Sequence, residues 1–91
     1  MDVKEKVTEA LRRHFQPDHI RLENDDGITG FIVSSRFQKM PSLDRQKLID
    51  DALRKSSVKL TKPELRQVVI IAGLTPVEYA ALGYEEKKSR R

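Results

Sequence analysis

A helical pattern lies between two strand patterns in residues 28–73, and this order restricts the possible folds more than any other feature. Residues 28–37, ITGFIVSSRF, are rich in β-branched and aromatic side chains, and residues 67–73, QVVIIAG, form a short continuous apolar run. Residues 42–55 between them repeat apolar side chains at helical spacing. A helical connection between two strands makes them parallel neighbours with a right-handed crossover. The sequence therefore predicts a parallel strand pair with a helix packed against it.

The residues before this unit predict a helix followed by a β-hairpin. Asp2 and Glu5 have the spacing of a capping box, and Pro17 ends the helix. Residues 19–24, HIRLEN, alternate as a half-buried strand does, and residues 24–27, NDDG, predict the hairpin turn. The apolar face of the first helix is predicted to consist of Val3, Val7, Ala10, Leu11 and Phe15.

Two further helices are predicted after the hairpin. Ser42 follows Pro41 and is the predicted N-cap of the first, and residues 55–63, KSSVKLTKP, form a polar connection to the last strand. The final helix is predicted to begin at Thr75 and to end near Gly83. Its N-cap, its proline at N1 and its N3 carboxylate are Thr75, Pro76 and Glu78. The predicted fold class is α+β, a three-stranded mixed sheet packed with helices in the order α-β-β-α-β-α.

The apolar pattern also predicts how these elements pack. The run in residues 67–73 is typical of a strand covered on both faces or placed at the centre of a sheet. Ser34, Ser35 and Ser42 are expected to satisfy backbone groups between the second strand and the helix. The charged residues of that helix, Arg45, Lys47, Arg54 and Lys55, are expected to lie mostly toward solvent. The predicted core includes Phe31, Val33, Phe37, Leu43, Leu48, Ile49, Leu53, Val69 and Ile71.

Length and composition predict one small domain. A chain of 91 residues can bury one apolar core, so residues 1–83 are assigned to a single domain and residues 84–91 to a charged, disordered tail. The chain has no cysteine, which excludes disulfides and thiolate ligands from the chain acting alone. It has no apolar run of the roughly 20 residues that span a bilayer, and no signal-peptide pattern. We therefore expect a cytoplasmic protein without a membrane partner.

The positive charge is concentrated in the middle of the sequence. Residues 34–66 contain nine Lys and Arg side chains against four Asp and Glu, whereas the whole chain has a net charge of +4. A basic surface attracts phosphate, so DNA or RNA is a predicted partner. With few aromatic residues, contact with backbone phosphates is expected rather than base stacking. The candidate nucleic-acid-binding residues are Arg36, Lys39, Arg45, Lys47, Arg54, Lys55, Lys59, Lys62 and Arg66.

No group of residues has the spacing of a catalytic or metal site, so neither an enzyme nor a cofactor is predicted. His14 and His19 flank Pro17, and a structural or exposed role is expected for both. Asp25 and Asp26 are explained by turn chemistry. Residues 27–30, GITG, match the G-x-x-G loop with which KH domains clamp a nucleic-acid backbone, but that loop joins two helices and this one lies in a predicted hairpin.

Three motifs together resemble the BolA-like family. They are an x-P-x-H-hydrophobic entry to the first strand in FQPDHIRLEND, V-S-x-x-F with a downstream L-x-R helix in FIVSSRFQKMPSLDRQKLIDDAL, and a strand leading to T-P-x-E-aromatic in VVIIAGLTPVEY. The resemblance covers residues 11–79. It implies a compact α+β fold similar to type II KH domains. It also implies either DNA binding with transcriptional control or iron-sulfur handling with monothiol glutaredoxins.

The sequence departs from this family at its metal ligands. The family's histidine on the last strand aligns with Gln67, and the histidine of its R-H-R helix motif aligns with Gln46. The loop between the first two strands is short and contains neither Cys nor His. Glutamine is a poor substitute for imidazole at an iron-sulfur site. The first hypothesis is therefore a regulatory nucleic-acid-binding module, and the alternative is an interaction module for a monothiol glutaredoxin or iron-sulfur trafficking partner.

Overall fold

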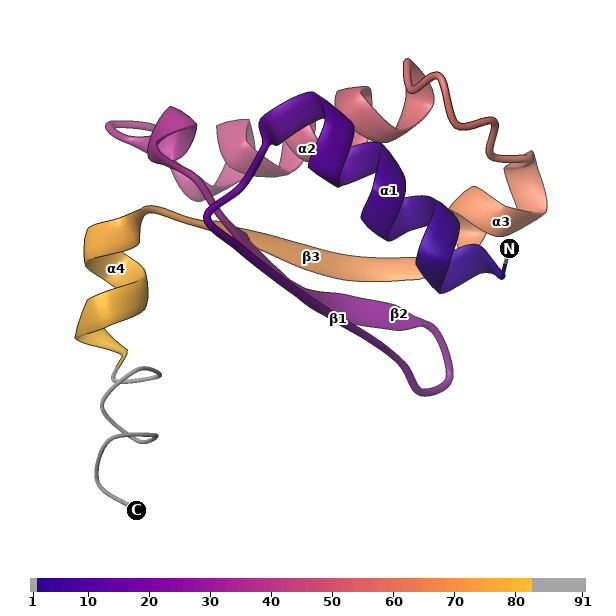
Figure 1. Cartoon of the computed structure of the whole chain (residues 1–91), viewed down its shortest axis with the longest axis horizontal. Helices are drawn as coiled ribbons and strands as arrows, with labels where there is room; N and C mark the ends of the chain where they lie inside the picture. Colours follow the sequence, from indigo (N-terminus) through magenta and orange to yellow (C-terminus); the bar gives the residue numbers. More distant parts are fainter. Residues whose placement is uncertain (1, 83–91) are drawn as a thin grey trace.

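The computed structural model describes residues 2–82, which form two layers (Figure 1). Helices α1 and α2 lie side by side on one face of a three-stranded sheet, and α4 extends beyond the end of β3. The predicted α+β fold class is confirmed. Along the chain the elements are α1 (Val3–Phe15), β1 (His19–Asn24), β2 (Ile28–Val33), the 3-10 helix η1 (Ser35–Phe37), α2 (Ser42–Arg54), α3 (Lys62–Arg66), β3 (Val68–Leu74) and α4 (Pro76–Ala81).

The sheet is mixed, with β2 at its centre. β1 and β2 pair antiparallel as a hairpin, with Asn24 opposite Ile28, and β2 pairs with β3 in parallel. The predicted hairpin and the predicted parallel pair are both confirmed. The order β1-β2-β3 places β3 at an edge of the sheet, so the prediction that this strand is central or covered on both faces is wrong. Its exposed side chains include Val69 and Ile70.

The core lies between the two helices and the sheet. α1 contributes the predicted apolar face, and α2 contributes Ile49, Ala52 and Leu53. Ile32 and Ile71 reach the same cluster from β2 and β3, where both are almost fully buried. The cluster is continuous through both layers, and its members are Val7, Ala10, Leu11, Phe15, Leu22, Ile28, Ile32, Phe37, Ile49, Ala52, Leu53 and Ile71.

Five predicted core positions do not belong to this cluster. Two of them still avoid solvent, because Val33 is fully buried and Leu48 packs against the cluster from α2. Leu43 is 65% exposed because it lies in the first turn of α2, on the side turned away from the sheet. Val69 is 62% exposed because it lies at an irregularity in the β2–β3 register. Phe31 is half-buried and points to the sheet face opposite α1 and α2, where its ring centroid lies 5.8 Å from that of Tyr79.

Helix caps are mostly where the sequence predicts them. Asp2 and Thr75 form complete capping boxes with Glu5 and Glu78. Ser34 accepts a hydrogen bond from the backbone N–H of Arg36, as expected for the strand exit. The predicted N-cap Ser42 is wrong, because Pro41 is the cap of α2 and makes no side-chain hydrogen bond there. The predicted disordered tail, residues 84–91, lies outside the described residues.

Candidate nucleic-acid interface and the groove beside β3

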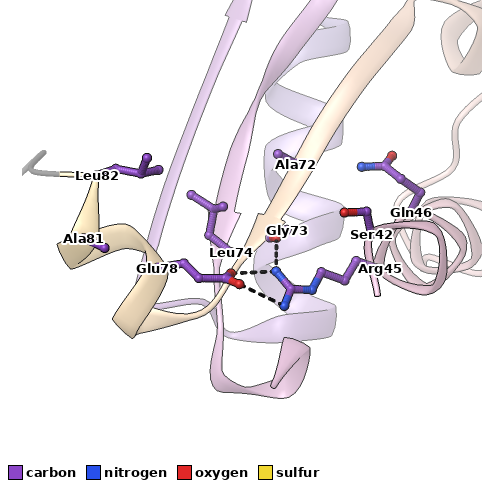
Figure 2. Close-up of a pocket in the computed structure, with 9 residues that line it drawn as sticks. All are labelled: Ser42, Arg45, Gln46, Ala72, Gly73, Leu74, Glu78, Ala81 and Leu82. Carbon is purple, nitrogen blue, oxygen red and sulfur yellow. Dashed lines mark hydrogen bonds and ion pairs between the residues drawn. The ribbon is translucent and has the colours of Figure 1, made fainter. Parts of the chain in front are cut away.

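Arg45 lies in a groove between α2, the end of β3 and α4 (Figure 2). Its guanidinium donates two hydrogen bonds to the Glu78 carboxylate, from Nη1 to Oε1 at 2.6 Å and from Nη2 to Oε2 at 3.1 Å. The Arg45 side chain is only 13% exposed, so the prediction that it points to solvent is wrong. It lies one turn before Ile49 on the side of α2 that faces the sheet, and this position explains its burial.

Side chains from α2 also cover the outer edge of β3. Nη1 of Arg45 donates to the Gly73 carbonyl at 2.9 Å, and Nε2 of Gln46 donates to the Ile71 carbonyl at 2.9 Å. Both carbonyls lie on the side of β3 that has no neighbouring strand. An edge strand with free backbone groups invites pairing with another chain, and polar side chains that occupy those groups prevent it. The groove of about 430 Å³ is therefore bounded by an edge whose carbonyls at Ile71 and Gly73 already accept hydrogen bonds.

The pair between Arg45 and Glu78 has a structural role. The hydrogen bond from Arg45, and next the backbone N–H of Thr75, lower the pKa of Glu78 from 4.5 to about 2. The same carboxylate completes the capping box of α4. Arg45 is thus paired with a carboxylate that stays ionised at neutral pH.

Apart from Lys47, the other predicted basic residues fall into two separate groups. Arg36 and Lys39 precede α2, and the Arg36 guanidinium donates to the His14 carbonyl and lies 5.0 Å from the Phe15 ring centroid. Lys47 is exposed in the middle of α2. A helix of this length separates its two ends by about 20 Å, so the nine candidates do not form one surface. The group at the carboxyl end of α2 consists of Arg54, Lys55, Lys59, Lys62 and Arg66.

This second group surrounds a loop that joins two helices. Residues 62–66 form α3, which the prediction of a simple polar connection had missed. Its capping box pairs Thr61 with Glu64, and the T-x-x-E spacing is a signal in the sequence that identifies the helix start. Lys55, Lys59 and Lys62 are all exposed. No acidic residue lies between Asp51 and Glu64, so the loop carries uncompensated positive charge.

A small groove of about 130 Å³ lies next to this loop, between α2, α3 and β3, and its lining includes Gln46 and Asp50 as well as apolar side chains. Ile49 and Leu53 line it from α2, Leu65 from α3, and the exposed Ile70 from β3. The basic loop therefore adjoins a recess of mixed polar and apolar lining, to which Asp50 contributes a carboxylate.

The remaining candidate motifs have structural explanations. Gly27 and Gly30 belong to the β1–β2 hairpin, so GITG does not join two helices. His19 stacks on Tyr79 with ring centroids 4.5 Å apart. Gln67 ends α3, and its carbonyl accepts the Ile28 N–H at 2.7 Å. Among residues 2–82 no three His, Cys, Asp or Glu side chains are grouped so as to hold a metal ion, and no helix is long and apolar enough to cross a bilayer.

Solved structures with the same arrangement of helices and strands identify the fold. A bol-like protein from Babesia bovis is 28% identical and superimposes with a TM-score of 0.66 over 91% of this chain and 95% of its own. The chain has the BolA-like fold. BolA1 from Arabidopsis thaliana, at 21% identity, has the same fold, with a TM-score of 0.68 over 86% of this chain and 96% of its own. No protein-family model and no curated protein sequence matches the chain.

The comparison confirms the resemblance inferred from the three sequence motifs. In this BolA-like chain the Arg45 of the L-x-R motif and the Glu78 of the T-P-x-E motif are the two partners of one ion pair. Two of the motifs that carry the resemblance therefore include residues that join α2 to α4. Gln46, which replaces the motif's histidine, makes a structural hydrogen bond to β3.

Proposed function

We propose that this BolA-like domain is a cytoplasmic, non-enzymatic binding module that contacts nucleic-acid backbone through the loop between α2 and α3. The observation that carries the proposal is that a lysine-rich loop without acidic residues joins two helices beside the sheet. KH domains, whose type II fold the BolA-like fold resembles, hold their backbone-clamping loop between two helices. The proposed contact residues are Lys55, Lys59, Lys62 and Arg66.

The chemistry of the loop favours phosphate contacts over base recognition. It contains no glycine, so a phosphate cannot approach the peptide N–H groups as closely as in a G-x-x-G clamp. Lysine ammonium groups and the hydroxyls of Ser56 and Ser57 supply the donors instead. No aromatic residue lies between residues 54 and 66, so base stacking has no platform there. The proposed binding is thus weakly sequence-dependent and strongly salt-dependent.

Titration of fluorescent single-stranded RNA and duplex DNA of several sequences tests the proposal. With about three phosphate contacts, log affinity should fall against log salt with a slope of about −2 on single strands and −3 on duplex. Charge reversal at Lys59 and Lys62 should weaken binding to every sequence by a similar factor. The matched control is Lys4→Glu/Arg12→Glu on the exposed side of α1, which changes net charge equally. Equal loss in both variants would contradict a local site.

A protein partner of the monothiol glutaredoxin class is the second candidate. It is favoured by the groove at Arg45, whose lining combines the apolar side chains of Ala72, Leu74, Ala81 and the exposed Leu82 with the Arg45–Glu78 pair. A mixed apolar and polar lining suits a protein surface better than phosphate. In calorimetric titration with a monothiol glutaredoxin, Leu82→Ser should reduce the binding heat if this groove is used, while Lys59→Glu/Lys62→Glu should leave it unchanged.

A further inference from the structure

The two edges of the sheet differ in how their backbone groups are satisfied. Arg45 and Gln46 occupy the outer carbonyls of β3. At Ile20, Leu22 and Asn24 of β1, no side chain of residues 2–82 makes an equivalent hydrogen bond to the outward backbone groups. In the part of the chain that the structure describes, one edge is thus covered by side chains of α2, and the outward groups at these three positions of β1 are bare.

The register identifies which groups of β1 point outward. The N–H of Ile28 donates to Gln67, away from β1, and antiparallel positions alternate between bonded and non-bonded pairs. Asn24, opposite Ile28, is therefore at a non-bonded position, as are Leu22 and Ile20.

The side chains of β1 are complementary to a second copy of the same strand. Leu22 is buried under the helices, so its neighbours Arg21 and Glu23 lie on the opposite face, where their side chains are 67% and 64% exposed. Within one chain they form an exposed ion pair, with Arg21 Nε 3.7 Å from Glu23 Oε2, and exposed pairs of this kind contribute little and can exchange partners. In a two-fold antiparallel pairing centred on Leu22, Arg21 of each strand lies opposite Glu23 of the other. These two pairs fall at non-bonded positions, where side chains approach most closely.

We propose that the bare edge of β1 binds the β1 edge of a second copy of this chain, which joins the two sheets into one. Ile20, Leu22 and Asn24 supply about six backbone hydrogen bonds across the two-fold axis, and two Arg21–Glu23 pairs fix the register. The partner is a second copy because the charge pattern is self-complementary in this one register. The surface lies on the opposite side of the sheet from the α2–α3 loop, so the inference does not depend on the proposed nucleic-acid contact.

Sedimentation equilibrium of the full chain over a wide concentration range tests this pairing. Wild type should show a monomer–dimer equilibrium. Arg21→Glu places like charges opposite each other twice, and Glu23→Arg does the same with the other sign, so each single variant should dimerise roughly tenfold or more weakly. The control Lys4→Glu, which makes the same charge change on α1, should leave the equilibrium unaltered.

Restoration of the pairing separates this interface from a general effect of charge. The swapped variant Arg21→Glu/Glu23→Arg again places opposite charges across the axis and should dimerise as wild type does. An equimolar mixture of the two single variants should form a heterodimer, because one strand then carries two carboxylates and the other two guanidiniums. A wild-type protein that stays monomeric at every concentration would overturn the proposal. Arg21 and Glu23 would then be charges that keep the edge from pairing with another chain. Equal dimerisation of wild type and both single variants would also overturn the proposal.

Discussion

Arg45 of α2 donates two hydrogen bonds to Glu78 of α4, and the same guanidinium donates to the carbonyls of Gly73 and Met40. One side chain thus joins two helices, the end of β3 and the segment before α2. The contribution of this side chain to stability is large, because its removal would leave several polar groups without hydrogen-bond partners.

Arg45→Ala should therefore lower the free energy of unfolding by about 2 to 3 kcal/mol, because charge-assisted hydrogen bonds contribute more than neutral ones. Lys47→Ala, two residues along on the exposed side of the same helix, should change it by no more than about 0.5 kcal/mol. Urea unfolding monitored by circular dichroism measures both. Equal effects would mean that the Arg45 contacts do not stabilise the fold.

Acid should weaken the same connection through Glu78. Its pKa is about 2 when folded and 4.5 for the unperturbed group, so the ionised carboxylate stabilises the folded state above about pH 4.5. This contribution is lost as the pH falls through about 2. The stability advantage of wild type over Glu78→Gln should accordingly shrink as the pH is lowered. Because the Glu78 carboxylate is partly exposed, its contribution to stability is smaller than the pKa change alone implies. If the difference in unfolding free energy between wild type and Glu78→Gln stayed constant across this pH range, the lowered pKa of Glu78 would be contradicted.

The side of α2 that faces the core can be tested with two apolar residues of the same helix. Ile49→Ala should cost about 2 to 5 kcal/mol of unfolding free energy, because Ile49 is only 3% exposed and its removal leaves a cavity. Leu43→Ala should cost less than about 0.5 kcal/mol, because Leu43 is 65% exposed. Chemical denaturation of both variants, with m-values compared, provides the measurement. If Leu43→Ala lowered the free energy of unfolding more than Ile49→Ala, the side of α2 assigned to the core would be wrong.

Iron-sulfur chemistry provides a further prediction. Gln46 donates its amide N–H to Ile71, and Gln67 has only weak donor atoms for a soft metal. Addition of this protein to a cluster-loaded monothiol glutaredoxin should leave the visible absorption and circular dichroism of the cluster unchanged. A new spectrum that Gln67→Ala removes would show that glutamine serves as a ligand here. Gln67→His is the informative companion variant, since it restores the family's residue.

The sequence was sufficient for the order of the three strands and of α1, α2 and α4, because boundaries such as the capping box at Thr75 and the turn at residues 24–27 carry local signals. It was not sufficient for the position of β3. A continuous apolar run is shared by central strands and by an edge strand such as this one, so Val69 was wrongly assigned to the core.

The site was harder to predict than the fold. Charge alone placed Arg45 with the other basic residues, although its partner Glu78 lies 33 residues away in sequence and only the packing of α4 brings them together. The short helix α3 was missed because its five residues contain no periodic apolar pattern, even though T-x-x-E marks its start. Without α3 the lysine-rich loop resembled a linker rather than a connection between two helices.

The central position of β2 also determines the order of events during synthesis. β2 meets β1 directly after a tight turn, and hairpins of this kind form within roughly 10 μs. Its other edge pairs with β3, whose residues follow roughly 40 positions later, so that edge stays without a partner until the ribosome has released Leu74. The nascent chain therefore exposes two unpaired strand edges and half an apolar core while α2 is being made. The nascent chain is therefore most prone to aggregation before the native domain has formed.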